Sequence, residues 1–194
     1  MAVTSILKGV NLYLIGMMGA GKSTVGRLLA SRLGYHFFDT DALIEQATGQ
    51  SVRQIFAESG EAIFRQLESQ VLAQLCAQKN LLISTGGGIV TTPFNWSYLR
   101  HGVVVWLDVP VDTLYERLRR DGDRPLLQTP DPLQTLTDLL AQRERLYAQA
   151  DLRLSTQPTE TPEQTCDRLL TELPSILRSG PQILGEAAST NGHE

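Results

Sequence analysis

Residues 16–23 read GMMGAGKS and constrain the fold of this chain more than any other segment. They match the phosphate-binding loop pattern G-x-x-x-x-G-K-[ST] at every fixed position. Such a loop must aim several backbone N–H groups at a polyphosphate, which requires close approaches that a Cβ atom would obstruct. We therefore predict a nucleoside triphosphate site in which Lys22 contacts the β- and γ-phosphates and the Ser23 hydroxyl binds Mg²⁺. The alternative is a glycine-rich turn that contains Lys and Ser by chance.

The segments on either side of this loop favour the first interpretation. Residues 10–15 form a short β-prone run that ends directly at Gly16. After the loop, apolar residues recur at helical spacing as far as Leu33, and Gly34 follows as a stop signal. A strand, a glycine loop and a helix thus follow one another in the order that this motif requires.

Strand and helix signals alternate along the rest of the chain. The further strand candidates are residues 35–38, 81–84, 103–107 and 152–155. The helical segments begin near residues 41, 51, 60, 111, 132 and 162. This alternation predicts an α/β fold of P-loop kinase type, with a five-stranded parallel sheet and helices on both of its faces.

Some details of this plan are specific enough to be tested. The helix from about residue 60 is expected to bury the side chains Ile63, Phe64, Leu67, Val71, Leu72 and Leu75. Pro174 should end or kink the last helix. We expect residues 1–178 to form one domain, and residues 179–194, which mix Gly, Ser, Thr, Asn and Pro without periodicity, to form a disordered tail.

Composition excludes several classes of protein. The net charge of −4 over 194 residues gives a nucleic-acid partner no electrostatic support. No signal peptide and no apolar run long enough to span a bilayer is visible, so we expect a cytoplasmic protein without a membrane partner. Cys76 and Cys166 stand far apart, without a second ligand at metal-binding spacing, and are expected to be buried free thiols.

Two carboxylates follow the second strand candidate, in the segment Asp39-Thr40-Asp41. Ligand groups in parallel α/β sheets lie at the carboxyl ends of the strands, and alternate residues of an extended segment point to the same side. One carboxylate could therefore serve Mg²⁺ and the other a substrate hydroxyl. Alternatively, one Asp caps the helix that begins here, and a cap together with a functional carboxylate is also compatible with the pattern.

Two arginines occupy unusual helical positions. Arg65 lies beside the apolar stripe near the start of its helix, where the helix dipole disfavours a cation, and periodicity alone favours a solvated surface arginine. Arg143 lies on the apolar face of the helix from Pro132, where an unpaired charge would be expensive. It must pair with an internal carboxylate or meet an anionic ligand, and the sequence leaves both possibilities open.

Two loops complete the candidate site. Gly86, Gly87 and Gly88 follow the third strand candidate, where either a ligand approaches the backbone closely or the chain makes a tight turn. Residues 119–131 form a loop that contains Arg119, Arg120 and Arg124. An Arg-bearing lid can close over phosphates and offset the charge that develops in phosphoryl transfer, whereas the alternative is a solvated connector.

Taken together, the motifs of residues 11–156 resemble the shikimate kinase family. The shared elements are GMMGAGKST, FFDTD, the pair Phe64-Arg65, STGGG, and RPLL followed by RxxLY. The P-loop alone is common to many NTPases, but the combination is specific. The resemblance implies a five-stranded P-loop kinase that uses ATP and Mg²⁺ to phosphorylate the 3-hydroxyl of shikimate, a step in chorismate and aromatic amino acid biosynthesis.

The resemblance also implies a role for each matching residue. Lys22 and the amides of Gly19, Ala20, Gly21, Ser23 and Thr24 would hold the ATP phosphates, with Arg124 in the lid and Arg120 near adenine. Ser23 and Asp39 would support Mg²⁺. Asp41 would hydrogen-bond the attacking hydroxyl, and Lys22, Asp41 and Arg124 would be the catalytic set. Arg65, Arg143 and the Gly87 N–H would bind the shikimate carboxylate. For Arg143, the resemblance therefore favours an anionic ligand over an internal carboxylate as its partner.

The chain departs from the family pattern at two points. The lid between Arg120 and Arg124 is short, and residues 156–159 offer Gln157 where relatives place another nucleotide contact. Two rival functions are another small P-loop kinase, such as one specific for gluconate, and a non-catalytic nucleotide-binding module. The first should lack the combined DTD, FR and TGGG motifs, and the second needs no carboxylate aimed at a hydroxyl. We expect the protein to be a monomer.

Overall fold

A five-stranded, all-parallel sheet forms the centre of the computed structural model, which describes residues 7–119 and 129–179. The strands are β1 (Leu12–Ile15), β2 (His36–Asp39), β3 (Leu81–Ser84), β4 (Val103–Asp108) and β5 (Leu152–Ser155), and they lie in the order β2-β3-β1-β4-β5. Each strand candidate is therefore confirmed; residues 81–84 and 152–155 have the predicted bounds, and the ends of the other three are displaced by one or two residues.

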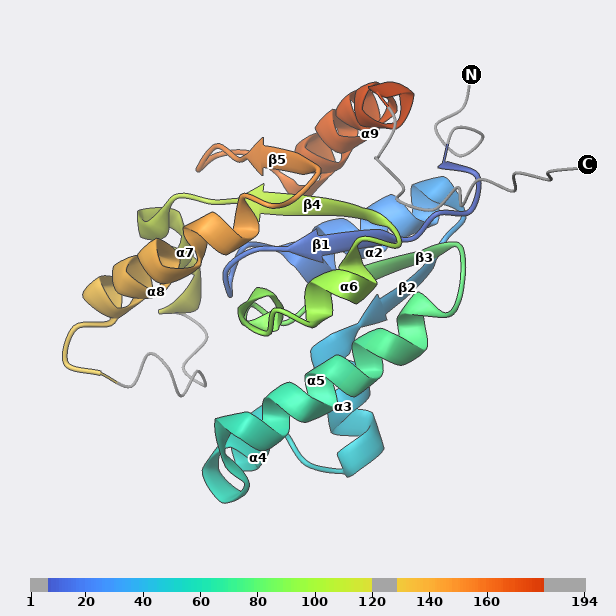
Figure 1. Cartoon of the computed structure of the whole chain (residues 1–194). Coiled ribbons are helices and arrows are strands. Elements are labelled where there is room, and N and C mark those ends of the chain that lie inside the picture. The colour runs from blue at the N-terminus through green and yellow to red at the C-terminus, as the bar shows by residue number, and fades with distance from the viewer. Residues whose placement is uncertain (1–6, 120–128, 180–194) are drawn as a thin grey trace, which may run out of the picture.

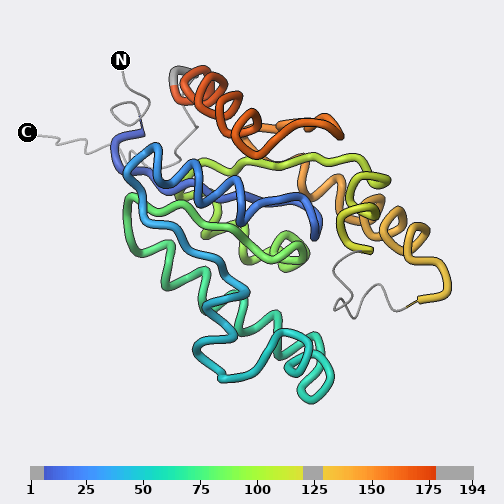
Figure 2. The backbone as a smooth tube through the Cα atoms, turned by 180° about the vertical axis from the view of Figure 1, so that it is seen from behind, coloured from blue at the N-terminus to red at the C-terminus, as the bar shows by residue number. Residues whose placement is uncertain are grey.

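Helices cover both faces of this sheet. They are α2 (Lys22–Leu33), α3 (Thr40–Thr48), α4 (Val52–Glu58), α5 (Gly60–Cys76), α6 (Asn95–Leu99), α7 (Val111–Leu118), α8 (Pro132–Tyr147) and α9 (Pro162–Ser179), with a 3₁₀ turn η1 (Ile89–Thr91). In Figure 1, α5 and α6 lie in front of the strands, whereas α2 lies behind them and contacts α9. Figure 2 shows the opposite side, with α2 in front. The predicted α/β architecture is confirmed.

Local sequence signals account for most helix ends. Gly34 adopts the left-handed conformation that ends α2, and its N–H bonds to the carbonyl of Ala30. Ser51 and Gln54 form a capping box at the start of α4. Asp131 accepts a hydrogen bond from the N–H of Gln134, and Pro132 occupies the first position of α8.

The core is built from the strands, as expected for a parallel sheet covered on both faces. All four residues of β1 are fully buried, and so is Trp106 in β4. A second, smaller hydrophobic cluster contains Ile44, Ile55 and Phe64, from α3, α4 and α5. These three helices therefore pack around a small core of their own, beside the edge strand β2.

Some sequence expectations need correction. Ile63 was expected to be buried but is 43% exposed, because α5 turns only the stripe through Phe64, Leu72 and Leu75 fully inward. The last helix continues through Pro174 to Ser179, so Pro174 does not end it, and the alternative of a kink at Pro174 stays a prediction. Cys166 is buried, but Cys76 is only half-buried; both are free thiols.

Other expectations are only partly covered by the described residues. The predicted tail, residues 179–194, lies outside them apart from Ser179, and most of the predicted lid, residues 120–128, also lies outside them. None of the described helices is both long and apolar enough to cross a membrane.

The order of the strands places the glycine loops at one edge. The chain leaves the central strand β1, forms β2 and β3 on one side, and then crosses to β4 on the other side. Crevices that bind ligands in open α/β sheets lie at such a switch point, beyond the carboxyl ends of the strands. The loop after β1 is the GMMGAGKS segment, and the loop after β3 contains Gly86, Gly87 and Gly88.

Candidate active site

The GMMGAGKS loop wraps the start of α2. This helix begins at Lys22, directly after Gly21, which adopts the left-handed conformation. The Lys22 side chain is buried, and its Nζ donates hydrogen bonds to the carbonyls of Gly16 and Met17, at 2.9 and 2.8 Å. The positive charge of Lys22 thus lies over the loop, next to the positive end of the helix dipole, and together they form a site for an anion.

A large cavity, about 500 Å³, opens in front of this loop. Its lining includes Met18, Gly19, Ala20, Gly21, Lys22, Ser23, Thr24, Val25, Asp39, Asp41, Ser84, Thr85, Gly87, Arg117, Thr156, Glu160, Pro162 and Thr165. All six residues from Gly19 to Thr24 that were predicted to bind ATP lie on its wall. The structure therefore brings the predicted phosphate site together.

Ser23 and Asp39 meet at the base of the cavity. Ser23 Oγ donates to Asp39 Oδ2 at 2.5 Å and lies 3.2 Å from Ser84 Oγ. The pairing of β2 with β3 explains this cluster, because Asp39 and Ser84 are register partners at the ends of their strands. A hydroxyl and a carboxylate are oxygen ligands of the kind that Mg²⁺ prefers, and Mg²⁺ takes its other ligands from phosphate and water.

Asp39 also caps the next helix. Its Oδ1 accepts hydrogen bonds from the N–H groups of Asp41 and Ala42, while its Oδ2 accepts from Ser23. The capping role of Asp39 is therefore confirmed, while its other carboxylate oxygen faces Ser23 and its role toward Mg²⁺ stays a prediction. Asp41 lies in the first turn of α3, on the wall of the cavity.

A second, smaller cavity of about 120 Å³ adjoins the first. Its lining consists of Met18, Asp41, Val52, Phe56, Phe64, Arg65, Glu68, Gly86, Gly87, Gly88 and Arg143. Three residues, Met18, Asp41 and Gly87, line both cavities. The carboxylate of Asp41 therefore lies at the boundary between the phosphate site and a compartment with two arginines, as its predicted role at an attacking hydroxyl requires.

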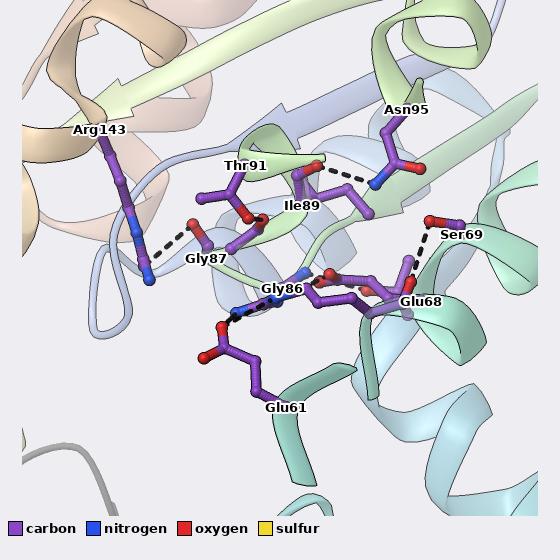
Figure 3. A network of polar contacts seen from close by, with 12 residues as sticks. Glu61, Glu68, Ser69, Gly86, Gly87, Ile89, Thr91, Asn95 and Arg143 are labelled. Carbon is purple, nitrogen blue, oxygen red and sulfur yellow. Dashed lines mark hydrogen bonds and ion pairs between the residues drawn. The ribbon is translucent and has the colours of Figure 1, made fainter. Parts of the chain in front are cut away.

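Arg65 is held in this compartment by two carboxylates of its own helix. Its Nη1 donates to Glu68 Oε2 at 2.8 Å, and its Nε and Nη2 donate to Glu61 Oε1 at 3.2 and 2.9 Å. Only 16% of the Arg65 side chain is exposed. Arg65 is thus not the solvated surface arginine that periodicity alone favours. Figure 3 shows Glu61 and Glu68 at the two ends of this group.

The carboxyl group of Glu68 is strongly perturbed by its surroundings. Its side chain is fully buried, and burial raises its pKa from 4.5 to about 7, although the positive charge of Arg65 opposes the shift. The nearby charge of Asp41 raises the pKa further. Glu68 therefore changes its protonation state near neutral pH, within the wall of the smaller cavity.

Arg143 approaches the same compartment from α8, on the opposite side of the glycine loop (Figure 3). It is buried, and its Nη1 lies 3.4 Å from the carbonyl oxygen of Gly87, a long hydrogen bond. Its charge lowers the pKa of Glu68, but no ion pair joins the two within the part of the chain that the structure describes. The sequence left two possibilities for Arg143, an ion pair with an internal carboxylate or contact with an anionic ligand. The structure does not show the ion pair among the described residues.

Close side-chain packing explains two of the three consecutive glycines. A Cβ atom at Gly86 would clash with Glu68 Oε1 and lie 2.8 Å from Asp41 Oδ1. A Cβ atom at Gly88 would clash with the guanidinium of Arg65. Gly86 and Gly88 thus leave room for side chains of the site that approach the backbone. This cause was not among the predicted alternatives, which were a ligand or a tight turn.

Two predicted arginines, Arg120 and Arg124, lie outside the described residues. The described arginine on the nucleotide side is Arg117 in α7, whose Nη1 donates to the carbonyl of Gly19 at 3.2 Å. Gln157, the suggested nucleotide contact, is exposed and does not line the large cavity, whereas the adjacent Thr156 does.

Sequence reasoning missed three residues of the site: Glu68, Arg117 and Tyr147. A signal existed for Glu68, because it lies four residues after Phe64 and four before Leu72 on the buried stripe of α5. Tyr147 is the last residue of the RxxLY motif, but no role was predicted for its hydroxyl, which bonds to the carbonyl of Gly87.

Comparisons with known proteins agree with this geometry. The family model described as shikimate kinase matches residues 18–174. A shikimate kinase from Nostoc sp. is 59% identical over 176 residues, which cover 91% of this chain and 97% of that protein. A shikimate kinase from Thermosynechococcus vestitus is 57% identical, over 89% of this chain and 94% of the relative.

Solved structures show the same similarity. A shikimate kinase from Acinetobacter baumannii, solved in complex with shikimate, superposes with a TM-score of 0.83 at 40% identity and covers 92% of this chain and 98% of its own. A gluconokinase from Sinorhizobium meliloti, at 14% identity and a TM-score of 0.53 over 88% of this chain and 95% of its own, shares the fold alone.

Proposed function

The chain belongs to the shikimate kinase family and phosphorylates shikimate with ATP, and we propose that its two adjoining cavities divide the two substrates between them. The large cavity receives ATP and the small cavity receives shikimate. The observation that carries this assignment is the shared wall, since Asp41 and Gly87 line both cavities. A group bound in one cavity thereby lies next to a group bound in the other.

On the ATP side, the amides from Gly19 to Thr24 hold the phosphates, and Lys22 neutralises their charge. Both roles follow from a cavity wall that is formed by the start of a helix. Arg117 extends along this wall and offers its planar guanidinium to the nucleotide. Arg124 is the proposed lid arginine on the transferred phosphate and Arg120 the proposed contact of the adenine, with Arg117 as a further candidate because it lines the ATP cavity.

Ser23 and Asp39 are the residues that would hold Mg²⁺. Both offer oxygen atoms at the end of β2 and the start of α2, on the wall of the ATP cavity. When bound there, Mg²⁺ would offset the negative charge of the phosphates during transfer. Asp39 is fixed by its second role as the cap of α3, so its free energy of reorganisation on metal binding should be small.

On the acceptor side, Arg65, Arg143 and the N–H of Gly87 bind the shikimate carboxylate. A guanidinium presents parallel N–H donors that match a carboxylate, and two of them from different helices fix the ring in one orientation. Asp41 then accepts a hydrogen bond from the attacking hydroxyl and orients its oxygen toward the γ-phosphate. Phosphoryl transfer needs little covalent chemistry from the protein, so positioning and charge neutralisation supply most of the barrier reduction.

Steady-state kinetics of two variants test this division. Arg143→Ala should raise the KM for shikimate about tenfold or more, with a KM for ATP within about twofold of wild type, because it removes a charged hydrogen bond to one substrate only. Lys22→Ala should reduce kcat by at least about a hundredfold. Arg100→Ala is the matched control, because Arg100 is exposed and lines neither cavity, and it should leave these kinetic constants unchanged. An equal loss of nucleotide affinity in Lys22→Ala and Arg143→Ala would contradict the division.

We further propose that the enzyme acts as a monomer in the cytoplasm. The residues proposed above for ATP, Mg²⁺ and shikimate all belong to one copy of the chain, which is compatible with catalysis by a monomer. Sedimentation of the purified protein during turnover measures this state directly, and activity confined to a dimer fraction would refute it.

A further inference from the structure

Tyr147 joins the acceptor site to the phosphate loop, although it lines neither cavity. It lies one helical turn after Arg143 on α8, and it is fully buried. Its hydroxyl donates to the carbonyl oxygen of Gly87 at 2.5 Å and lies 3.7 Å from Met17 Sδ. Arg143 approaches the same Gly87 carbonyl from 3.4 Å, so two donors of one helix converge on one acceptor.

All three carbonyls of the glycine loop are engaged by donors. Ile89 N–H bonds to the carbonyl of Gly86 at 3.1 Å, and Thr91 bonds to that of Gly88 through its N–H at 2.9 Å. The Gly87 carbonyl, between these two, is the one that depends on Tyr147. Within residues 7–119 and 129–179, no acceptor takes the N–H of Gly87 or of Gly88. Both glycines line the smaller cavity.

We propose that Tyr147 is a positioning residue, which fixes the Gly87–Gly88 peptide so that the N–H of Gly88 joins the neighbouring N–H of Gly87 as a donor to the carboxylate of shikimate. The proposal rests on the acceptor site proposed above. The C=O of Gly87 and the N–H of Gly88 belong to one planar trans peptide unit and point in opposite directions. A hydroxyl that holds the carbonyl toward α8 therefore turns the N–H away from α8.

The surroundings of Tyr147 keep its hydroxyl in place as a donor. The ring stacks on Trp106 of β4, with centroids 5.6 Å apart and an interplanar angle of 27°. Burial raises the pKa of Tyr147 to about 12, so the hydroxyl keeps its proton throughout the physiological range. The donor is therefore neither rotated away nor ionised under the conditions of the reaction.

The Gly87 peptide also contacts the phosphate loop. A Cβ atom at Gly87 would lie 3.3 Å from Met18 N and 3.4 Å from Gly16 O. Gly87 is thus packed closely against the backbone of the GMMGAGKS loop. The Tyr147 hydroxyl contacts both the Gly87 carbonyl and Met17 of that loop, so it helps to hold the two loops in a fixed relative position.

A purely structural role is the alternative, in which Tyr147 only fills the core beside Trp106. Tyr147→Phe separates the two, because phenylalanine keeps the ring and loses the donor. We expect the KM for shikimate to rise about five- to tenfold, the effect of one buried hydrogen bond, with kcat and the KM for ATP within about twofold of wild type. A structural role would lower the Tm and leave all three kinetic constants unchanged.

Two further variants make the result decisive. Tyr13→Phe is the matched control, because Tyr13 is an equally buried tyrosine in β1 that lines neither cavity. It should leave the KM for shikimate unchanged. Arg143→Ala tests the acceptor site itself. If Arg143→Ala raises the KM for shikimate and Tyr147→Phe does not, the role of Tyr147 is refuted alone; if neither raises it, the acceptor site proposed above fails as well.

Binding provides a second measurement that does not depend on the active fraction. The rise in Tm at saturating shikimate should be smaller for Tyr147→Phe than for Tyr13→Phe. All kinetics are measured at a temperature at which circular dichroism shows each variant to be folded. An equal rise in Tm for the two tyrosine variants would overturn the proposal.

Discussion

Replacement of the buried Glu68 by glutamine should stabilise this enzyme at alkaline pH while it weakens the binding of shikimate. In the unfolded chain this carboxyl ionises near pH 4.5, whereas in the folded protein burial raises its pKa to about 7. The folded state therefore binds more protons than the unfolded state between these values. The contribution of Glu68 to stability is fully present below pH 4.5 and is lost as the pH rises through 7.

The size of this loss follows from the pKa. A carboxyl whose pKa rises from 4.5 to about 7 disfavours its ionised form by about 3 kcal/mol relative to water. Glutamine resembles the protonated acid in shape and has no proton to lose. At pH 8 the Glu68→Gln protein should therefore be more stable than wild type by up to about 3 kcal/mol, a Tm higher by roughly 5–10 °C. At pH 5 the difference should fall to about 1 kcal/mol or less.

The loss of the ion pair with Arg65 does not reverse this expectation. The attraction of Arg65 already opposes the rise of the Glu68 pKa, and the raised value is what remains after it. Arg65 also keeps its hydrogen bonds to Glu61, and the glutamine oxygen can still accept from Nη1. The clamp on shikimate should nevertheless weaken, because a neutral acceptor orients a guanidinium less firmly than a carboxylate does.

Thermal denaturation followed by circular dichroism, from pH 5 to 8.5 at constant ionic strength, measures the difference. Glu61→Gln is the matched control, because Glu61 bonds to the same arginine but its side chain is 62% exposed. The Tm of the Glu61→Gln protein should therefore differ little from that of wild type, at every pH. A Glu68→Gln protein that is less stable than wild type at pH 8 would refute the reasoning. A Tm difference that is the same at pH 5 and pH 8 would refute it equally.

Three further outcomes follow from the site. Arg117→Ala should raise the KM for ATP about tenfold and leave that for shikimate within about twofold, in steady-state assays; an unchanged KM for ATP removes Arg117 from the nucleotide site. Gly86→Ala should lower stability by about 1–3 kcal/mol, measured by denaturant titration, because the added Cβ clashes with Glu68 and crowds Asp41; full stability would mean that these side chains move freely. Chelation of Mg²⁺ should abolish turnover without changing the affinity for shikimate by more than about twofold in calorimetry, and activity without the metal would contradict the role of Ser23 and Asp39.

The sequence predicted the parallel sheet because its strands are short apolar runs that alternate with amphipathic helices. It did not predict the strand order β2-β3-β1-β4-β5, since pairing between strands depends on contacts that no local pattern contains. The exposure of Ile63 was missed for a related reason. Periodicity identifies a helical face, but the width of the buried stripe depends on what packs against it.

The site was predictable where a motif has a physical mechanism of its own. The GMMGAGKS loop, the cap at Asp39 and the inward position of Arg143 all follow from local rules and are confirmed by the structure. Glu68 was missed because a helical glutamate is usually solvated, and its burial depends on Arg65 in the preceding turn and on Gly86 from another loop. Such convergence is a tertiary property.

The proposed carboxylate clamp is tested most directly by calorimetric binding of shikimate and of its methyl ester to wild type and to Arg143→Ala. The ester keeps the ring and hydroxyls and removes the negative charge. We predict that Arg143→Ala loses about ten- to a hundredfold in affinity for shikimate, as expected for a charged hydrogen bond, and less than about threefold for the ester. An equal loss for both ligands would show that Arg143 does not contact the carboxylate, and the assignment of the smaller cavity to the acceptor would be wrong.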